Sequence, residues 1–194
     1  MNNDYVNTGR INQKLETRNK ILDSAKYFLS RGDSFNLEDV AEHTGISRAT
    51  IYRYFSNIEL LTSEAVLDLS TKKPETLYDE LSGKTIEEMI LGVQDYFNSL
   101  AIDHEAAFRK YLSTTLSSDS SKIIRGARRK KTLQLILQTA KIPHKEKENI
   151  ANLLTLLMGI EPLIVTKDVC GLDSRASKLL MRSGIELILK SLFK

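Results

Sequence analysis

The chain has 194 residues, 41% hydrophobic and 27% charged, which is ordinary for a soluble globular protein. This length allows one large domain or two small ones. A formal net charge of +3 is too small to indicate nucleic-acid binding by itself. The single cysteine, Cys170, excludes an internal disulfide and a multi-cysteine metal site. Since no apolar run is long enough to span a bilayer and the N-terminal residues lack a signal-peptide core, we expect a cytoplasmic protein with no membrane partner.

Helical patterns run through the chain, whereas alternating runs of β-branched residues bounded by turn pairs do not occur. We therefore predict an all-α protein of about nine helices. The first is expected over about residues 15–30, because apolar residues recur there every three or four positions. The segment that leads into it is basic, and we expect it to form an arm carrying Arg10, Lys14, Arg18 and Lys20.

Residues 35–61 contain two short helical patterns joined by a tight turn. Asn36 is a preferred cap for the first helix, and Asp39, three positions later, can answer it in a capping box. Gly45 tolerates the positive φ that ends such a helix, and Ser47 caps the second. This order of caps and turn predicts a helix-turn-helix.

The exposed side of the second helix indicates what the motif binds. With Ile51 and Phe55 turned inward, the outward residues at the helix N-terminus are those that enter the DNA major groove in a helix-turn-helix. Arginine pairs with guanine, threonine bonds a base or touches the thymine methyl, alanine allows close approach, and tyrosine hydroxyls donate to phosphates. The predicted DNA-contacting residues are Arg48, Ala49, Thr50, Tyr52, Arg53 and Tyr54. The alternative is a helical hairpin whose second helix is only a solvated face.

Residues 17–61 closely resemble the N-terminal domain of the TetR family of transcriptional regulators. The family pattern has an Ile-Leu-x-x-Ala first helix with a following aromatic residue and glycine, a Thr-x-x-x-Ile-Ala helix, an Ala-Gly-Val-Ser turn and a Tyr-x-x-Phe recognition helix. The matching residues are Ile21, Leu22, Ala25, Phe28, Gly32, Val40, Ala41, Gly45, Ile46, Ser47, Thr50, Tyr52 and Phe55. The resemblance implies a three-helix DNA-binding domain joined through a fourth helix to a helical domain that dimerises and binds a small-molecule effector.

Two positions depart from this family pattern. Asn36 stands where the family has threonine, and it keeps both the capping and the phosphate-contact chemistry, so we add it to the predicted DNA-contacting residues. Ile58 stands where the family has a phosphate-contacting lysine, and we expect its loss to lower non-specific affinity for DNA. At the start of the fourth helix, Ser56 has capping-box spacing with Glu59, whereas the family pattern favours Asn57 as the cap.

The fourth helix is expected to end near Thr71, and Pro74 marks the predicted domain boundary. This divides the chain into a DNA-binding domain, residues 1–73 with the motif at about 37–55, and an effector-binding and dimerisation domain, residues 74–194. Five more helices are predicted in the second domain. The first of them begins after a Thr85–Glu88 capping box, and Asp103 is the predicted cap of the second. The other three span about 123–140, 145–166 and 174–193, and a loop is predicted at 117–121. A kink is expected at Pro162.

The last two predicted helices are apolar on nearly all sides, so each must be covered on several sides. A second subunit is the simplest cover in a chain this short, and glycines in both helices would allow close approach. We predict a two-fold homodimer formed through a four-helix bundle. The predicted interface residues are Leu156, Gly159, Ile160, Leu180, Gly184, Leu187 and Ile188. The alternative is that both helices form the central core of a monomer.

An effector pocket is predicted between the fifth and eighth helices from apolar and aromatic side chains with polar tips. The candidates are Met89, Tyr96, Phe97, Phe108, Tyr111 and Met158, with Glu161 as a buried polar anchor. Core packing is the alternative explanation for each of them. A basic run, formed by Arg125, Arg128, Arg129, Lys130 and Lys131, is interpreted as a solvated helix face, although it could also bind phosphate or an acidic ligand.

No metal, cofactor or catalytic site is expected. The three histidines lie far apart without metal-ligand spacing, and no glycine-rich phosphate loop or nucleophile elbow occurs. The sequence therefore predicts a TetR-like dimeric repressor that responds to a small molecule and binds a near-palindromic double-stranded DNA operator. Two alternatives stay open: a helical sensor or partner-binding protein whose helix-turn-helix no longer binds DNA, and a helical enzyme whose active site is the pocket.

Overall fold

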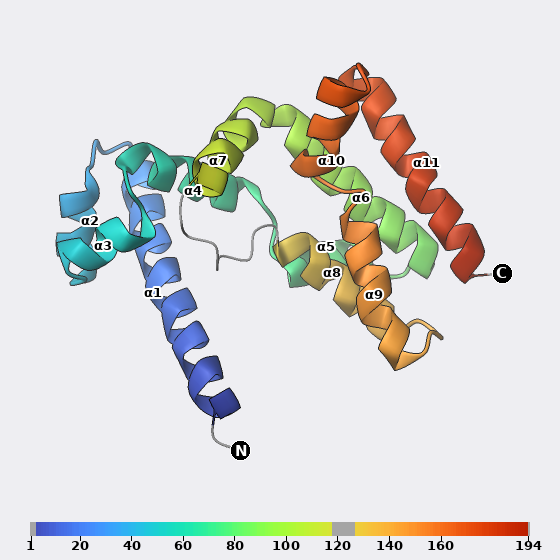
Figure 1. Ribbon diagram of the computed structural model, residues 1–194, viewed down its shortest axis with the longest axis horizontal. Coiled ribbons are helices and arrows are strands. Elements are labelled where there is room, and N and C mark those ends of the chain that lie inside the picture. Colours follow the sequence, from blue (N-terminus) through green and yellow to red (C-terminus); the bar gives the residue numbers. More distant parts are fainter. Residues whose placement is uncertain (1–2, 118–126, 194) are drawn as a thin grey trace. The chain divides into compact units, whose positions relative to one another are not determined.

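A computed structural model describes residues 3–117 and 127–193 of the chain, and every regular element in these residues is helical (Figure 1). The predicted all-α class is therefore confirmed. The chain divides into two compact units. The N-terminal unit comprises Met1–Ser70 and Lys110–Ser121, and the C-terminal unit comprises Thr71–Arg109 and Lys122–Lys194.

The N-terminal unit is built from α1 (Asn3–Arg31), α2 (Leu37–Thr44), α3 (Arg48–Tyr54), α4 (Ile58–Ser70) and the later part of α7 (Glu105–Ser117). Its core gathers the apolar residues that the helical periodicity of α1 to α4 turns inward. They are Ile21, Leu22, Ala25, Leu37, Val40, Ala41, Ile51, Phe55, Leu60, Leu61 and Ala65. This core holds α2 and α3 against α1 and α4.

Helix α1 begins at Asn3, so the expected basic arm is wrong over residues 14–20, which lie within the helix. An ion pair joins Arg18 of α1 to Glu64 of α4, and both side chains are 11% exposed. Lys26 likewise binds Asp68 of α4 at 2.7 Å. Arg18 therefore joins α1 to α4 through this ion pair, and its charge is not free to contact DNA.

The C-terminal unit contains α5 (Pro74–Leu81), α6 (Ile86–Asp103), the start of α7, α8 (Ala127–Gln138), α9 (His144–Thr155), α10 (Ile160–Ile164), the π-helix η1 (Val165–Val169) and α11 (Ser174–Leu192). The predicted capping box of α6 is confirmed, since Thr85 and Glu88 bond each other's backbone N–H groups at 2.9 and 3.2 Å. Asp103 ends α6 and does not cap the next helix. Residues 118–126, with most of the predicted loop, lie outside the described residues.

The core of the C-terminal unit is contributed mainly by α6, α8, α9 and α11. Its buried residues are Leu77, Leu81, Met89, Ile90, Val93, Phe97, Leu100, Leu133, Ile136, Leu137, Ala140, Ile150, Ala151, Leu154, Met158, Ile185 and Leu189. Helix α5 was not predicted. Pro74 is its first residue, a position where the missing N–H of proline costs no intrahelical hydrogen bond.

The predicted single helix over residues 145–166 is broken into α9, α10 and η1. The break lies at Gly159, whose φ is 83°, and not at Pro162. Pro162 lies in the first turn of α10, where an N–H group has no intrahelical acceptor, so it causes no kink. In the described part of the chain, no single helix is long and apolar enough to cross a membrane. His144–Thr155 and Ile160–Val169, bent by 41°, meet those criteria only as a pair.

Candidate nucleic-acid interface

The first helix of the motif, α2, starts at the predicted capping box. The side chain of Asn36 accepts hydrogen bonds from the N–H groups of Glu38 and Asp39 at 2.8 and 3.0 Å. In return, the Asp39 carboxylate accepts from the Asn36 N–H at 2.8 Å. These bonds satisfy N–H groups that have no partner within the helix, so they hold the start of α2 in one geometry.

The turn between α2 and α3 is closed by Gly45, whose φ of 68° is the left-handed conformation expected there. A residue that the sequence analysis missed, Thr44, supports it: its hydroxyl donates to the Val40 carbonyl at 2.7 Å and accepts from the Ile46 N–H at 3.3 Å. Ser47 then caps α3 by accepting from the Thr50 N–H at 3.3 Å. The helix-turn-helix geometry is thus set by contacts between near neighbours in sequence.

Helix α3 is anchored by Ile51 and Phe55, both fully buried in the core of the N-terminal unit. The Arg18 guanidinium lies 5.2 Å from the centre of the Phe55 ring while it pairs with Glu64. Desolvation by burial raises the pKa of Glu64, and the Arg18 charge opposes that effect. The inner face of α3 is therefore packed against the core, and its outer face is available to a ligand.

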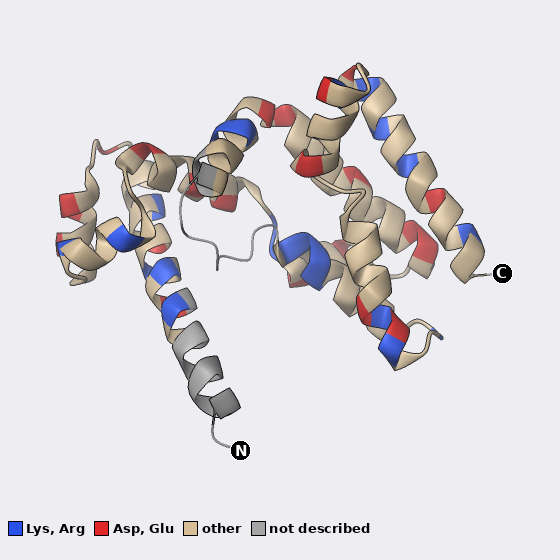
Figure 2. Ribbon diagram, in the orientation of Figure 1, with Lys and Arg blue, Asp and Glu red and all other residues tan. Residues whose placement is uncertain are grey.

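The predicted DNA-contacting residues of α3 differ in exposure. Arg48, Ala49, Tyr52 and Arg53 are exposed, whereas Thr50 and Tyr54 are half-buried. The Thr50 hydroxyl accepts from the Ser47 hydroxyl at 3.0 Å, and Tyr54 packs against the core. Basic residues lie on α3 and acidic residues on α2 (Figure 2). The first turn of α3 exposes Arg48 beside the small residue Ala49.

Tyr52 has a partner that the sequence analysis did not find. Its hydroxyl, on α3, donates to the carboxylate of Glu38, on α2, at 3.0 Å, and the two residues are 14 positions apart in the sequence. This hydrogen bond raises the pKa of the Tyr52 hydroxyl, because ionisation would place two negative charges side by side. No local pattern signals such a pair, since it depends on how α2 and α3 cross.

The start of α4 holds the predicted cap and one of the two departures from the family pattern. The side chain of Asn57 caps α4 by accepting from the Leu60 N–H at 2.8 Å, which confirms the cap that the family pattern favoured. Ile58 packs against the core of the N-terminal unit. The side chain at position 58 is therefore apolar and half-buried, and it cannot act as a cation toward phosphate.

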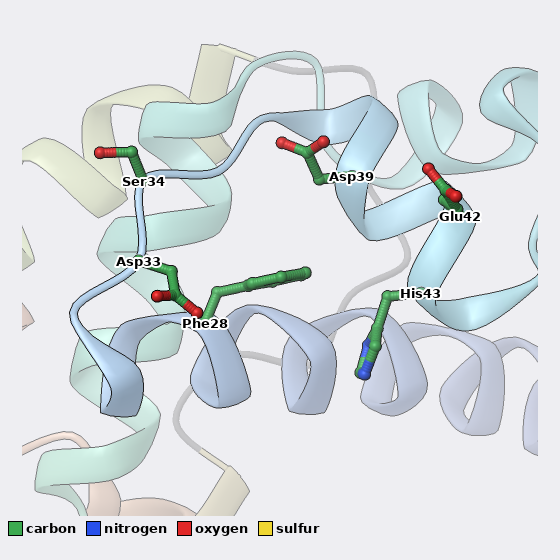
Figure 3. Close-up of a pocket in the computed structure, with 6 residues that line it drawn as sticks. All are labelled: Phe28, Asp33, Ser34, Asp39, Glu42 and His43. Atoms are coloured by element: carbon green, nitrogen blue, oxygen red, sulfur yellow. The ribbon is translucent and has the colours of Figure 1, made fainter.

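A groove of about 580 Å³ lies beside α2 in the N-terminal unit and is lined by Phe28, Asp33, Ser34, Asp39, Glu42 and His43. Figure 3 shows the Phe28 ring extending from α1 into the space between α1 and α2. None of these residues belongs to the predicted DNA-contacting or effector sets. His43 forms a hydrogen bond with the Ser24 hydroxyl at 2.8 Å and stacks on Tyr27. These two contacts join α2 to α1. Carboxylates line this groove, and they would repel a phosphate.

The caps, the glycine turn, the buried anchors of α3 and its exposed first turn together define a helix-turn-helix DNA-binding domain. Residues 21–65, which hold this domain, match the family described as "Bacterial regulatory proteins, tetR family". That is a family of regulators and not of enzymes. No curated protein matches the chain.

The predicted effector residues do not all come together. Met89, Phe97 and Met158 are buried in the core of the C-terminal unit, and Tyr96 and Phe108 pack against it. Tyr111 instead packs against the core of the N-terminal unit. Glu161 is not the expected buried anchor, because its side chain is 41% exposed, although it binds Arg129 at 2.8 Å.

The predicted dimer residues are also divided. Leu156, Leu180 and Leu187 are exposed and Ile188 is half-buried, whereas Ile160 is buried in its own chain. Gly159 forms the break before α10, and a Cβ there would overlap the Arg129 guanidinium. Gly184 does allow a close approach, because a Cβ there would lie 3.0 Å from Leu157 of the same chain.

The basic run of α8 is only partly the solvated face that we expected. Arg128 donates to the Thr71 carbonyl, and Arg129 donates to the Met158 carbonyl. Lys130 binds Glu148 at 2.6 Å, and Lys131 binds Glu75 at 3.0 Å. These four cations are partnered within the chain, and Arg125 lies outside the described residues.

Proposed function

We propose that this protein is a ligand-responsive transcriptional repressor that binds a near-palindromic operator as a homodimer. The observation that carries the proposal is the first turn of α3, which exposes Arg48 and Ala49 on a helix-turn-helix of the tetR family. A regulator of transcription works where the DNA lies, so we propose a cytoplasmic location. The proposal assigns no cofactor.

On DNA, each subunit would place α3 in a major groove, with two half-sites about one helical turn apart, roughly 34–36 Å. Arg48 and Thr50 would read bases. The guanidinium matches the two acceptors of guanine, and the half-buried threonine offers a hydroxyl and a methyl group. Asn36, Tyr52, Arg53 and Tyr54 would contact the DNA backbone and set the register of α3 without reading sequence.

Dimer formation is supported by apolar side chains that the C-terminal unit leaves exposed on and just after α9, on η1 and on α11. They are Leu153, Leu156, Val165, Val169, Leu179, Leu180 and Leu187. Large exposed apolar patches mark interaction surfaces, and we propose that these residues form one. Leu187→Glu should therefore give monomers in sedimentation analysis. Leu69→Glu, at another exposed leucine, in the N-terminal unit, is the control that should leave the dimer intact. A dimeric Leu187→Glu protein would overturn this interface.

Effector binding is proposed for the C-terminal unit, near Tyr96. The Tyr96 hydroxyl accepts from the Lys72 N–H at 2.8 Å, and Arg128 donates to the Thr71 carbonyl. Side chains of α6 and α8 therefore hold the backbone directly after α4, which ends at Ser70. A small molecule that displaced Tyr96 would release this segment. It could shift the population of DNA-binding dimers only if its affinity differs between the dimer that binds DNA and the dimer that does not.

Selection of bound fragments from a random duplex pool tests the proposal, followed by titration of the enriched sequence at several salt concentrations. The expected result is a two-fold-related sequence whose affinity falls steeply as salt rises, because phosphate contacts release counterions. If a folded dimer enriches no sequence, the proposed function is wrong.

The second candidate is a helical sensor or partner-binding protein whose helix-turn-helix does not bind DNA. Two observations favour it: Ile58 packs against the core where a basic residue is expected, and Glu38 places a carboxylate beside α3. If this candidate is correct, the protein should form a dimer and show no salt-dependent binding to any DNA duplex.

A further inference from the structure

We propose that Glu38 is a specificity-determining residue that reads a cytosine at the edge of each half-site, with Tyr52 as its positioning residue. The inference rests on the proposed DNA-binding function and adds a base contact that lies outside α3. It starts from the hydrogen bond in which the Tyr52 hydroxyl donates to Oε1 of Glu38 at 3.0 Å.

The position of Glu38 is held from two directions. Its backbone N–H donates to the Asn36 side chain at 2.8 Å, so its Cα has a fixed place in the first turn of α2. Its side chain reaches Tyr52, which lies on the exposed margin of α3 with 48% of its surface accessible. Arg48, one turn earlier on α3, acts electrostatically on the same tyrosine hydroxyl. The carboxylate therefore lies on the face that α3 would turn toward DNA.

Tyr52 occupies only one of the two carboxylate oxygens. Within the described residues, Oε1 of Glu38 accepts from Tyr52, and Oε2 has no hydrogen-bond donor. A carboxylate has about four acceptor sites and no donor when it is ionised. The tyrosine hydroxyl thus orients the group and leaves acceptor capacity for a ligand.

This chemistry selects one kind of base edge. Phosphates repel a carboxylate on every sequence, so Glu38 weakens binding unless the DNA offers it a donor. Guanine presents only acceptors in the major groove, and adenine sets its N6 amino group beside the N7 acceptor, which repels a carboxylate. Cytosine presents its N4 amino group, which is the group that Glu and Asp accept from. Glu38 would therefore lower the affinity for DNA that has another base at this position, and cytosine would be accepted.

The test compares full-length wild-type protein, Glu38→Gln and Glu38→Ala in selections from the same random duplex pool. The wild type should enrich cytosine at one symmetry-related position of each half-site. Glu38→Gln should enrich adenine there, because a glutamine amide pairs with the N6 and N7 atoms of adenine. Glu38→Ala should show no preference at that position. The expected discrimination by the wild type is about tenfold, within the range for a good base contact.

Folding is not at risk in these variants, because the cap uses the backbone N–H of Glu38 and not its side chain. Tyr52→Phe tests the positioning role. It should weaken the cytosine preference when Glu38 is present and leave the same position unchanged when Glu38 is alanine. A double-mutant cycle isolates this coupling from any phosphate contact of Tyr52, which would persist in both backgrounds.

Two results would overturn the inference and leave the regulator intact. In the first, both Glu38 variants enrich the same sequence as the wild type at every position. In the second, they raise affinity for all sequences equally, which would make Glu38 only a source of repulsion. If the wild type enriches no sequence at all, the DNA-binding function and this inference fail together.

Discussion

Asn98 and Arg129 hold the two ends of a single peptide group, the one that joins Met158 to Gly159. Arg129 donates to the Met158 carbonyl, and the Asn98 side chain accepts from the Gly159 N–H at 2.8 Å. A third side chain, Gln94, donates to the Leu157 carbonyl at 3.0 Å. Backbone groups freed where α9 ends are thus satisfied by α6 and α8, which lets the chain break its helix inside the C-terminal unit.

Asn98→Ala should destabilise the C-terminal unit by about 1–3 kcal/mol, because the buried Gly159 N–H would lose its acceptor. Urea unfolding would measure the loss, and amide hydrogen exchange should accelerate at Gly159. Asn152→Ala, an exposed asparagine of α9, is the control and should change neither quantity. Unchanged exchange at Gly159 in Asn98→Ala would contradict this account of the break.

Gly159→Ala should destabilise the protein more than Gly171→Ala. Both glycines have positive φ, 83° and 69°, so alanine is strained at each. Only at Gly159 would the added Cβ also overlap the Arg129 guanidinium, and at Gly171 it would meet open space. The difference between the two melting temperatures therefore reports packing at the break. Equal losses would show that Arg129 moves aside freely.

Asn57→Ala should lower the unfolding free energy of the N-terminal unit by about 1 kcal/mol, since it removes the cap of α4. Ser56→Ala is the matched variant at the neighbouring position. It should have little effect, because Asn57 is the residue whose side chain accepts from the Leu60 N–H. Thermal unfolding, monitored by circular dichroism, would measure the loss of stability in each variant. A larger loss in Ser56→Ala than in Asn57→Ala would show that Ser56 is the cap.

Acid should weaken the contacts between the start of α7 and η1. Arg109 forms two hydrogen bonds of 2.7 Å with Asp168, and they lower the pKa of that carboxyl below its ordinary 3.8. Lys167, together with Arg109, lowers the pKa of Glu105 below its ordinary 4.5. Because these folded-state pKa values are depressed, their stabilisation is present above the ordinary values and disappears as pH falls through the folded ones.

The difference in unfolding free energy between wild type and Asp168→Asn should therefore be larger at pH 7 than at pH 3. Glu186→Gln serves as a control, since it removes a carboxylate of α11 whose ion pair with Arg182 stays within one helix. Both residues of the Asp168 pair are substantially exposed, and added salt should reduce the difference at pH 7. A difference independent of pH would mean that the carboxylate charge contributes nothing.

Arg48→Ala should relax base preference at one position of each half-site, at a cost of about 1–3 kcal/mol on the preferred sequence. Arg53→Ala is the comparison. As a proposed backbone contact, Arg53 should lose affinity on all sequences alike and reduce the salt slope by about 1. Selections and salt titrations on both variants separate the roles. Uniform loss for Arg48→Ala would make it a phosphate contact.

The features that could be predicted from the sequence depend on contacts between residues that are close to one another in the chain. The capping box of Asn36 and Asp39, the left-handed Gly45 and the Ser47 cap each depend on neighbours at most three positions away. The inward places of Ile51 and Phe55 follow from the helical repeat alone. Local chemistry and periodicity therefore determined the helix-turn-helix and its match to the tetR family.

Contacts that join distant segments could not be predicted from the sequence. The pairing of Arg18 with Glu64, 46 residues apart, turned an expected arm residue into a structural one. The bond between Tyr52 and Glu38 depends on how two helices cross. Gly159 could not be recognised as a break, because its peptide group is satisfied by α6 and α8, elements about 60 and 30 residues away. Only tertiary structure brings such partners together, since no short-range pattern specifies which distant side chain will satisfy a buried backbone or charged group.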